Sequence, residues 1–202
     1  MYRLIATAYI VLLFFVFLFV VVRRDQSASR GPLVTPSQTI VDPTPTHEPT
    51  ATPTPATGTP VRLVIPKLNL DVTVESKGEN EAGHMEVPSW ENVAWYNLGR
   101  RPGEQGSAVI AGHYDTDTGA PSTFYQLSTL QIDDEIYVQD ELNKVLRFVV
   151  RDIRNYDYFL FPINEVFADP VGRKLNLITC SGTWNHGLQT YSDRLVVFAE
   201  LQ

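Results

Sequence analysis

Short runs in which apolar and polar residues alternate dominate the chain from residue 61 onward, and this pattern most constrains its fold. The run LNLDVTV (68–74) places an apolar side chain at every second position, as in a strand with one buried face. Comparable runs rich in Val, Ile, Tyr and Phe are VAWYNL (93–98), SAVIAGH (107–113), EIYVQ (135–139), VLRFVVRDI (145–153), KLNLITC (174–180) and RLVVFAEL (194–201). Turn clusters such as RRPGEQG separate them. Many short strands in one domain predict a closed β-barrel or a sandwich, and we favour the barrel.

Two segments favour helix within this all-β pattern. PSTFYQL (121–127) and PINEVFA (162–168) each begin at a proline, which suits the first turn of a helix. We therefore expect two short helices beside the strands.

The amino-terminal segment predicts a membrane anchor. Leu4 to Val22 holds nineteen residues without a charge. At about 1.5 Å per residue such a helix spans roughly 28 Å, close to the hydrocarbon core of a bilayer. A cleaved signal peptide is the alternative, but its apolar region is usually only about 7–15 residues long. The flanking charges are nearly balanced, Arg3 facing Arg23 and Arg24. We expect an uncleaved transmembrane anchor over 1–24, a cytoplasmic amino terminus and an extracytoplasmic remainder.

Residues 25–60 predict an extended linker. This segment holds eight of the fourteen prolines, with many Thr and Ser, in runs such as DPTPTHEPTATPTP. Proline at this density removes backbone donors and blocks helix and central strand. Too few large apolar residues remain to offset the entropy of ordering. A Pro/Thr-rich stalk between anchor and domain is the expected arrangement.

The third segment, 61–202, is the expected folded domain. Its net charge bears on which classes of partner it can bind. It carries twelve Lys and Arg against twenty Asp and Glu, a net charge of −8. Nucleic-acid binding draws on clustered positive charge, so we expect no nucleic-acid partner. One cysteine and scattered histidines give no spacing for a metal site. The acidic turns at 115–117 and 133–135 are interpreted as solvated rather than calcium-binding, and no cofactor is expected.

Cys180 is the first candidate for chemistry because it is the only cysteine. It ends the predicted strand KLNLITC and precedes SGTWNHG, which is predicted to be a loop. Functional groups concentrate at such strand ends. A free cysteine is also commonly a small buried hydrophobe. From position alone, catalysis and packing both stay open.

A thiol that attacks an acyl carbon needs an imidazole and donors for the oxyanion. His113 ends the apolar strand SAVIAGH, whereas His186 is the rival, only six residues after the cysteine. Arg194 opens the predicted last strand, where its fork of donors could hold a carbonyl or an oxyanion. His113 also has a purely structural interpretation, and Arg194 has one as a solvated strand end.

Three stretches together resemble the signature of the sortases, membrane-bound cysteine transpeptidases. They are GSAVIAGH (106–113), LITC (177–180) and SDRLVVFA (192–199), in the family's order of His, Cys and Arg. The similarity extends over nearly all of 61–202, including IPKLNLDVTV and AWYNLGRRPGEQG. The motifs RPGEQGSAVIAGH and LITCSG are most similar to those of the class D, E and F sortases.

The resemblance implies an eight-stranded barrel with Cys180 as nucleophile, His113 as proton-transfer partner and Arg194 as stabiliser of the oxyanion. It implies cleavage of an LPxTG-type sorting signal through a thioester, and transfer to an amine of a peptidoglycan precursor or of a protein. We place substrate contacts at Tyr114, Ser181 and Ile178. Strand alternation puts Thr179 on the opposite face from Cys180, as a local support.

Three alternatives stay beside this reading. A pilin-assembling sortase is disfavoured because the linker's DPT lacks the aromatic residue of the Asp-Pro-aromatic lid. An L,D-transpeptidase would surround its cysteine with a Gly-Cys-Arg motif, whereas Thr179 and Ser181 flank this one. A non-catalytic surface-binding module would leave the thiol buried and unreactive.

Overall fold

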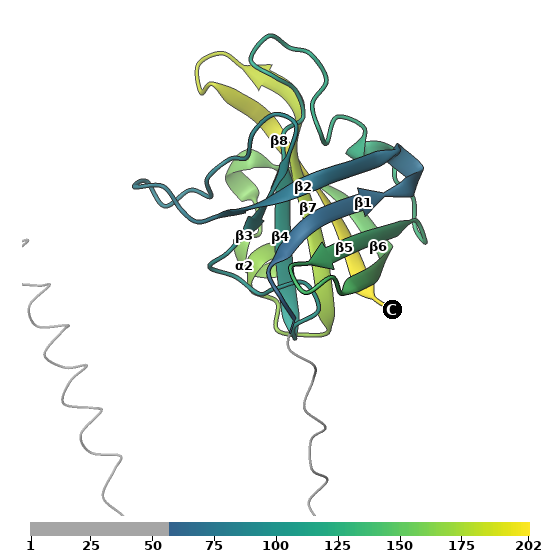
Figure 1. Cartoon of the computed structure of the whole chain (residues 1–202). Helices are drawn as coiled ribbons and strands as arrows, with labels where there is room; N and C mark the ends of the chain where they lie inside the picture. The colour runs from purple at the N-terminus through teal and green to yellow at the C-terminus, as the bar shows by residue number, and fades with distance from the viewer. Residues whose placement is uncertain (1–56) are drawn as a thin grey trace, which may run out of the picture. The chain divides into compact units, whose positions relative to one another are not determined.

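The computed structural model describes residues 57–202, which fold into one closed barrel of eight strands (Figure 1). Around the barrel the strand order is β1-β2-β3-β4-β7-β8-β6-β5. The strands are β1 (Pro60–Ile65), β2 (Leu70–Lys77), β3 (Val93–Tyr96), β4 (Gly106–Gly112), β5 (Glu135–Asp140), β6 (Val145–Asp157), β7 (Arg173–Asn185) and β8 (Thr190–Leu201). The predicted eight-stranded β-barrel is thereby confirmed.

The helical content is small. The only α-helix among residues 57–202 is α2 (Ile163–Phe167), and the 3₁₀ turns are η1 (Pro66–Leu68), η2 (Leu127–Thr129) and η3 (Tyr158–Leu160). The prediction of a helix over 162–168 is confirmed. The prediction over 121–127 is wrong: the chain there forms turns, in which Phe124 donates its backbone N–H to the carbonyl of His113. This bond to the end of β4 competes with helix formation.

The predicted anchor (1–24) and nearly all of the predicted linker (25–60) lie outside the described residues. Pro60, the last residue of that linker, begins β1 and pairs with Asp140 of β5. Within 57–202 no helix has the length and hydropathy that a membrane crossing requires.

Alternation along β7 builds two apolar layers. Leu175 and Leu177 belong to the large cluster that fills the barrel. Asn176 and Ile178 point to the other face, where Ile178 joins a small cluster with Val166 of α2. Asn176 donates its amide to the carbonyl of Val166 at 2.6 Å, which ties α2 to the barrel wall. The face of β7 that carries Cys180 is therefore the one that α2 partly covers.

The parallel pairing of β4 with β7 positions the candidate residues. Ala111 of β4 is the partner of Ile178 in β7, so two further positions along these strands lead to His113 and Cys180. Thr179 donates its hydroxyl to the carbonyl of Gly112 at 2.9 Å and extends this pairing beyond the ladder. Residues 67 positions apart in sequence thus reach the same end of the barrel.

The β7–β8 hairpin is longer than the sequence suggested. Cys180 does not end its strand, because β7 continues to Asn185, and Arg194 does not open β8, which starts at Thr190. A bulge between Ser181 and Trp184 allows this continuation. Gly182 adopts φ +82° within the bulge, a conformation that favours glycine, and the carboxylate of Asp193 occupies the space of a side chain there.

Candidate active site

Cys180 and Arg194 are direct partners in the antiparallel pairing of β7 with β8. Side chains of paired residues lie on the same face of a sheet, so the thiol and the guanidinium share one surface. Cys180 is partly buried and forms no disulfide. The pair therefore places a fixed positive charge next to a thiol that is not fully enclosed.

The pKa of the Cys180 thiol reflects three influences. Burial raises the pKa above its usual value because the thiolate loses solvation. The charge of Arg194 lowers the pKa, whereas the carboxylate of Asp115 raises it. The net shift is upward, so the resting site favours the neutral thiol. Formation of the thiolate therefore requires transfer of its proton to a base.

The guanidinium of Arg194 is held by the hairpin. One terminal nitrogen donates to the carbonyls of Tyr191 (3.1 Å) and Asp193 (2.8 Å), and the other donates to the hydroxyl of Thr190 (2.8 Å). The ring of Tyr158 lies 4.7 Å from the guanidinium carbon, within range of a cation–π contact. These contacts fix the planar group, and no carboxylate of residues 57–202 forms an ion pair with it, so its full charge stays available to a substrate oxygen.

His113 follows β4 directly, on the other side of β7 from Arg194. Its Nε2 lies 3.1 Å from the carbonyl of Pro88, to which it donates a hydrogen bond. The indole of Trp90 packs on the imidazole with 4.1 Å between ring centroids. The strand order β4-β7-β8 therefore sets an imidazole, a thiol and a guanidinium at one end of three adjacent strands.

Residues 63–202 match the family model described as the sortase domain. The chain belongs to the sortase family. Similar solved structures include a lid mutant of sortase A from Corynebacterium diphtheriae, with 19% identity and a TM-score of 0.54 over 73% of this chain and 72% of that one. Sortase C-1 from Actinomyces oris has 23% identity and a TM-score of 0.55, over 70% and 73% of the two chains. Listeria monocytogenes sortase A has 19% identity and a TM-score of 0.54, over 70% and 86%.

At these identities the solved structures establish that the sortase fold is shared. No match was found among curated proteins. The similar structures named above are sortases A and C, so the resemblance to classes D, E and F stays a prediction.

The predicted substrate contacts of this sortase domain have different surroundings. Tyr114 stacks against Tyr125 and Tyr191, at 4.8 and 5.5 Å between ring centroids. Ser181 is partly buried and donates its hydroxyl to Asn155 of β6. Ile178 is 8% exposed and packs in the layer below α2, so the free protein offers little of its surface. All three roles stay predictions.

His186 lies at the exposed tip of the β7–β8 hairpin in this sortase. Cys180 pairs with Arg194, and His186 lies five strand positions farther along the hairpin, one residue beyond the Asn185–Thr190 pair. This separation is about 15 Å along the hairpin. The hairpin therefore carries the rival histidine away from the thiol, while β4 brings His113 toward it.

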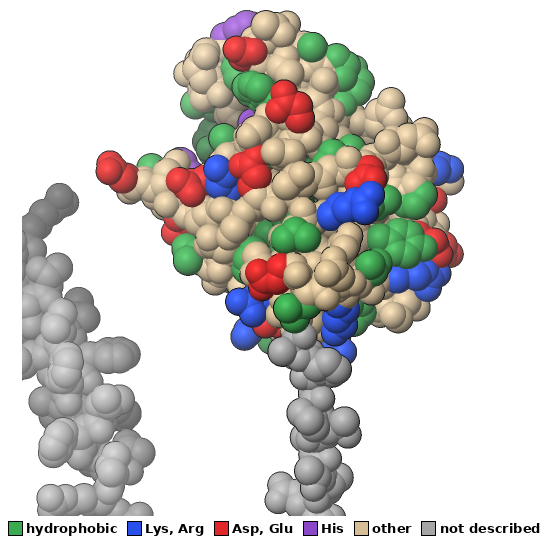
Figure 2. All heavy atoms as spheres, viewed as in Figure 1, with side chains coloured by type: hydrophobic (Ala, Val, Ile, Leu, Met, Phe, Trp, Pro, Cys, Tyr) green, Lys and Arg blue, Asp and Glu red, His purple; other side chains and the backbone are tan. Residues whose placement is uncertain are grey.

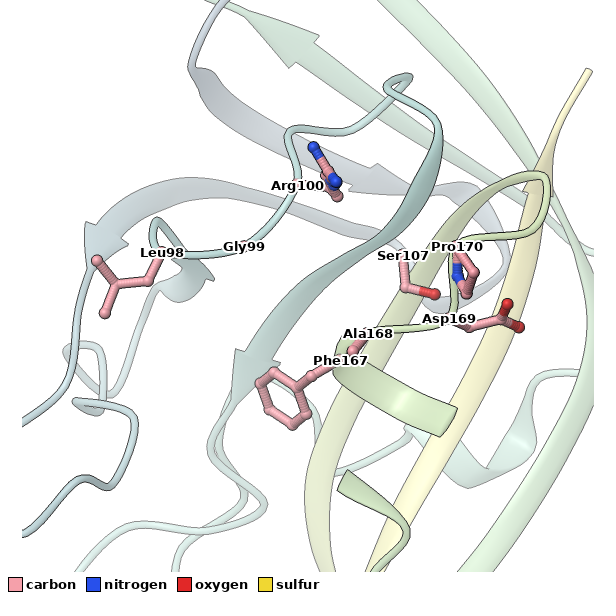
Figure 3. Close-up of a pocket in the computed structure, with 8 residues that line it drawn as sticks. All are labelled: Leu98, Gly99, Arg100, Ser107, Phe167, Ala168, Asp169 and Pro170. Carbon is pink, nitrogen blue, oxygen red and sulfur yellow. The ribbon is translucent and has the colours of Figure 1, made fainter. Parts of the chain in front are cut away.

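A pocket of about 290 Å³ lies at the far end of the sortase barrel (Figure 3). Leu98, Gly99 and Arg100 after β3 line one side, and α2 with the following Asp169 and Pro170 lines another. Ser107 of β4 also contributes, six residues before His113 and thus about 20 Å along the strand. This pocket is separate from the thiol.

On the face shown in Figure 2, Lys and Arg side chains are interspersed with Asp and Glu rather than gathered in a stripe. Among residues 57–202 there is no group of three or more His, Cys, Asp or Glu arranged to hold a metal ion.

Proposed function

We propose that this sortase is a cysteine transpeptidase that acts on an LPxTG-type sorting signal of a surface protein. The observation that carries the proposal is the pairing of Cys180 with Arg194, with His113 after the neighbouring strand. A thiol, a base and an oxyanion donor on one surface are the groups that acyl transfer requires.

The first half of the reaction makes a thioester. His113 accepts the proton of Cys180, and the thiolate sulfur attacks the carbonyl carbon of the scissile peptide bond. The negative charge on the oxygen is stabilised by Arg194. Collapse re-forms the carbonyl and breaks the C–N bond, while the imidazolium of His113 returns the proton to the leaving amine.

The second half transfers the acyl group. An amine attacks the thioester carbon and His113 takes the proton that the amine loses. The C–S bond then breaks, and His113 passes this proton to the sulfur, which restores the thiol of Cys180. We propose an amine of a peptidoglycan precursor as the acceptor, so that the product is a protein attached to the cell wall. No metal or cofactor enters these steps.

An exposed apolar patch supports a peptide substrate. Phe159 and Leu160 of η3 and Ile163, the first residue of α2, are 73%, 79% and 65% exposed. They adjoin Tyr158, whose ring contacts the guanidinium of Arg194. Exposed apolar groups beside a polar reactive centre suit a substrate with apolar residues near its cleaved bond. We propose that the sorting signal binds along this patch.

We also propose that residues 1–24 anchor the protein in the cell membrane and that 25–60 space the domain from it on the outer side. The apolar run of Leu4 to Val22 and the Pro/Thr-rich segment after it support this placement.

The experiment that tests the function uses an internally quenched LPxTG-type peptide with the full chain in detergent. It is run with and without a glycine-based or diaminopimelate-type amine. We expect cleavage that is abolished in Cys180→Ala and a product capped by the amine, identified by mass spectrometry. Near-wild-type turnover in Cys180→Ala would exclude the thioester route, and hydrolysis without capping would exclude transfer to that class of amine.

A further inference from the structure

The connection between β2 and β3 covers His113. Pro88 is buried and accepts the Nε2 hydrogen bond of the imidazole at 3.1 Å, while the indole of Trp90 packs against the ring face. Two residues from a single short segment thus contact the imidazole at its edge and its face. Neither belongs to β4, β7 or β8, the strands that set the thiol, the guanidinium and His113 itself.

Glu75 of β2 anchors this segment. One of its carboxylate oxygens accepts hydrogen bonds from the Ser89 backbone (3.1 Å), the Ser89 hydroxyl (2.7 Å) and the Asn92 amide (2.9 Å). The bonds from Asn92 and Ser89, together with Lys77, lower the pKa of Glu75 to about 2. The carboxylate is therefore charged throughout the physiological range and binds the segment at full strength.

A second attachment comes from the chain that follows His113. The hydroxyls of Ser122 and Thr123 both donate to the carbonyl of Trp90, at 2.6 and 2.8 Å. The segment 88–92 is thus tied at Ser89 and Asn92 to β2, and at Trp90 to the connection after β4. With both attachments in place, the acceptor carbonyl of Pro88 has little freedom to move.

We propose that Glu75 and the Pro88–Trp90 segment act as positioning residues that hold the His113 imidazole in one orientation and in the Nε2–H tautomer. A neutral imidazole carries a single N–H, and the Pro88 carbonyl can only accept, so Nε2 holds that proton and Nδ1 is left as the basic nitrogen. This inference rests on the proposed function, in which His113 takes a proton from Cys180.

Such positioning matters because β4 ends at Gly112, one residue before His113. The histidine stands outside the ladder, where its side chain would otherwise exchange among rotamers. Loss of orientation by about 1 Å in a proton-transfer partner costs up to about 100-fold in rate. A fixed ring presents the correct nitrogen in every encounter with substrate.

The tautomer is measured directly by long-range proton–nitrogen NMR correlation on the full chain in detergent, with ¹⁵N-labelled histidine. We expect the His113 signals of the wild-type protein above pH 8 to show Nε2–H alone. In Glu75→Ala and Trp90→Ala we expect averaged signals from two tautomers. Glu75→Gln, which keeps an acceptor oxygen, and Trp90→Phe, which keeps a ring face, should restore the wild-type signals.

A matched control is Glu86→Ala. Glu86 lies in the same connection, and its side chain accepts a bond from the Gly78 backbone at 3.2 Å rather than from the 88–92 segment. Its removal should leave the His113 signals unchanged. If Glu86→Ala loses the single tautomer to the same extent as Glu75→Ala, the loss comes from a general loosening of the loop, and the proposal is overturned.

Peptide turnover provides the second readout. We expect kcat to fall about 10- to 100-fold in Glu75→Ala and Trp90→Ala, with KM within about twofold. A raised KM with unchanged kcat would make Trp90 a substrate contact and overturn the positioning role. An unchanged tautomer in Glu75→Ala would also overturn it, even with Cys180-dependent turnover intact. Failure of the proposed function is recognised separately, as turnover that persists in Cys180→Ala.

Discussion

Cys180 and Arg194 are paired across β7 and β8, so a single antiparallel register sets the distance between the thiol and its nearest fixed cation. Antiparallel neighbours on the same face have Cβ atoms about 5 Å apart. Any change that shifts this register by one residue would turn one of the two side chains to the other face of the sheet. The placement of the thiol beside the guanidinium therefore depends on the β7–β8 register alone.

Arg194→Lys should lower kcat/KM for the sorting peptide about 100-fold while the domain stays folded. Lysine keeps the charge but cannot reproduce the planar set of bonds to Tyr191, Asp193 and Thr190. Peptide turnover and thermal unfolding measured together check this expectation. Wild-type turnover in the variant would remove Arg194 from the oxyanion role.

The reactivity of Cys180 should respond to Asp115 and Arg194 in opposite directions. The carboxylate of Asp115 raises the pKa of the thiol and the guanidinium of Arg194 lowers it. In Asp115→Asn the alkylation rate should therefore reach its half-maximum at lower pH than in the wild type, and in Arg194→Gln at higher pH. Iodoacetamide labelling followed by mass spectrometry measures both, with exposed Asp117→Asn as the control.

Gly112→Ala should destabilise the domain by about 1–3 kcal/mol and displace His113. An added Cβ would lie 2.6 Å from the ring of Phe124, which is fully buried and cannot swing into solvent. Gly78→Ala is the matched control, since its nearest atom, on the side chain of Asn97, would be 3.5 Å away. Urea unfolding of the two variants should differ. If the two variants are equally stable, the contact of the added Cβ with Phe124 does not determine the stability of the domain.

Glu75→Gln should flatten the acid limb of the stability curve. The folded pKa of Glu75 is about 2 against an ordinary value of 4.5. Its ionised form therefore contributes stability that is complete above about pH 4.5 and is lost as the pH falls through about 2. The free energy of unfolding, measured from pH 6 to pH 2, should fall less steeply in the variant. An identical slope would show that Glu75 titrates normally in the folded protein.

Asp140→Ala should reduce stability by about 3 kcal/mol without changing the turnover of the folded fraction. The buried carboxylate accepts backbone bonds from Gly58, Leu142 and Lys144 at 2.8–2.9 Å and joins the start of the domain to the β5–β6 turn. It lies at the barrel end opposite Cys180. Denaturant unfolding and active-site titration separate the two effects, and a change in kcat per active site would contradict this separation.

The sequence predicted much of the fold because its strands alternate with period two, and the candidate triad was recognised from its resemblance to a family. The full length of the β7–β8 hairpin could not be predicted. SGTWNHG looks like a loop, yet the bulge at Gly182 and the pairing of Trp184 with Tyr191 extend the strands through it. Local turn chemistry was outweighed there by cross-strand contacts.

The contacts of His113 with Pro88 and Trp90 were also beyond sequence reasoning. These residues lie 25 and 23 positions upstream of the histidine, in a connection without periodicity, and no motif links them to it. Ser89 and Asn92 on either side of Trp90 offered a weak signal, because Ser and Asn side chains commonly form hydrogen bonds in turns. Only the folded structure identifies the acceptor of their hydrogen bonds as the carboxylate of Glu75.

The strand order has a consequence for the timing of synthesis. β4 and β7 are neighbours in the barrel, yet His113 leaves the ribosome 67 positions before Cys180, whose partner Arg194 follows in the same hairpin. Pairings between such distant segments form late. A nascent chain that already contains His113 therefore lacks the thiol and the cation beside it until the β7–β8 hairpin docks. The three groups of the proposed acyl transfer thus come together only in the completed domain.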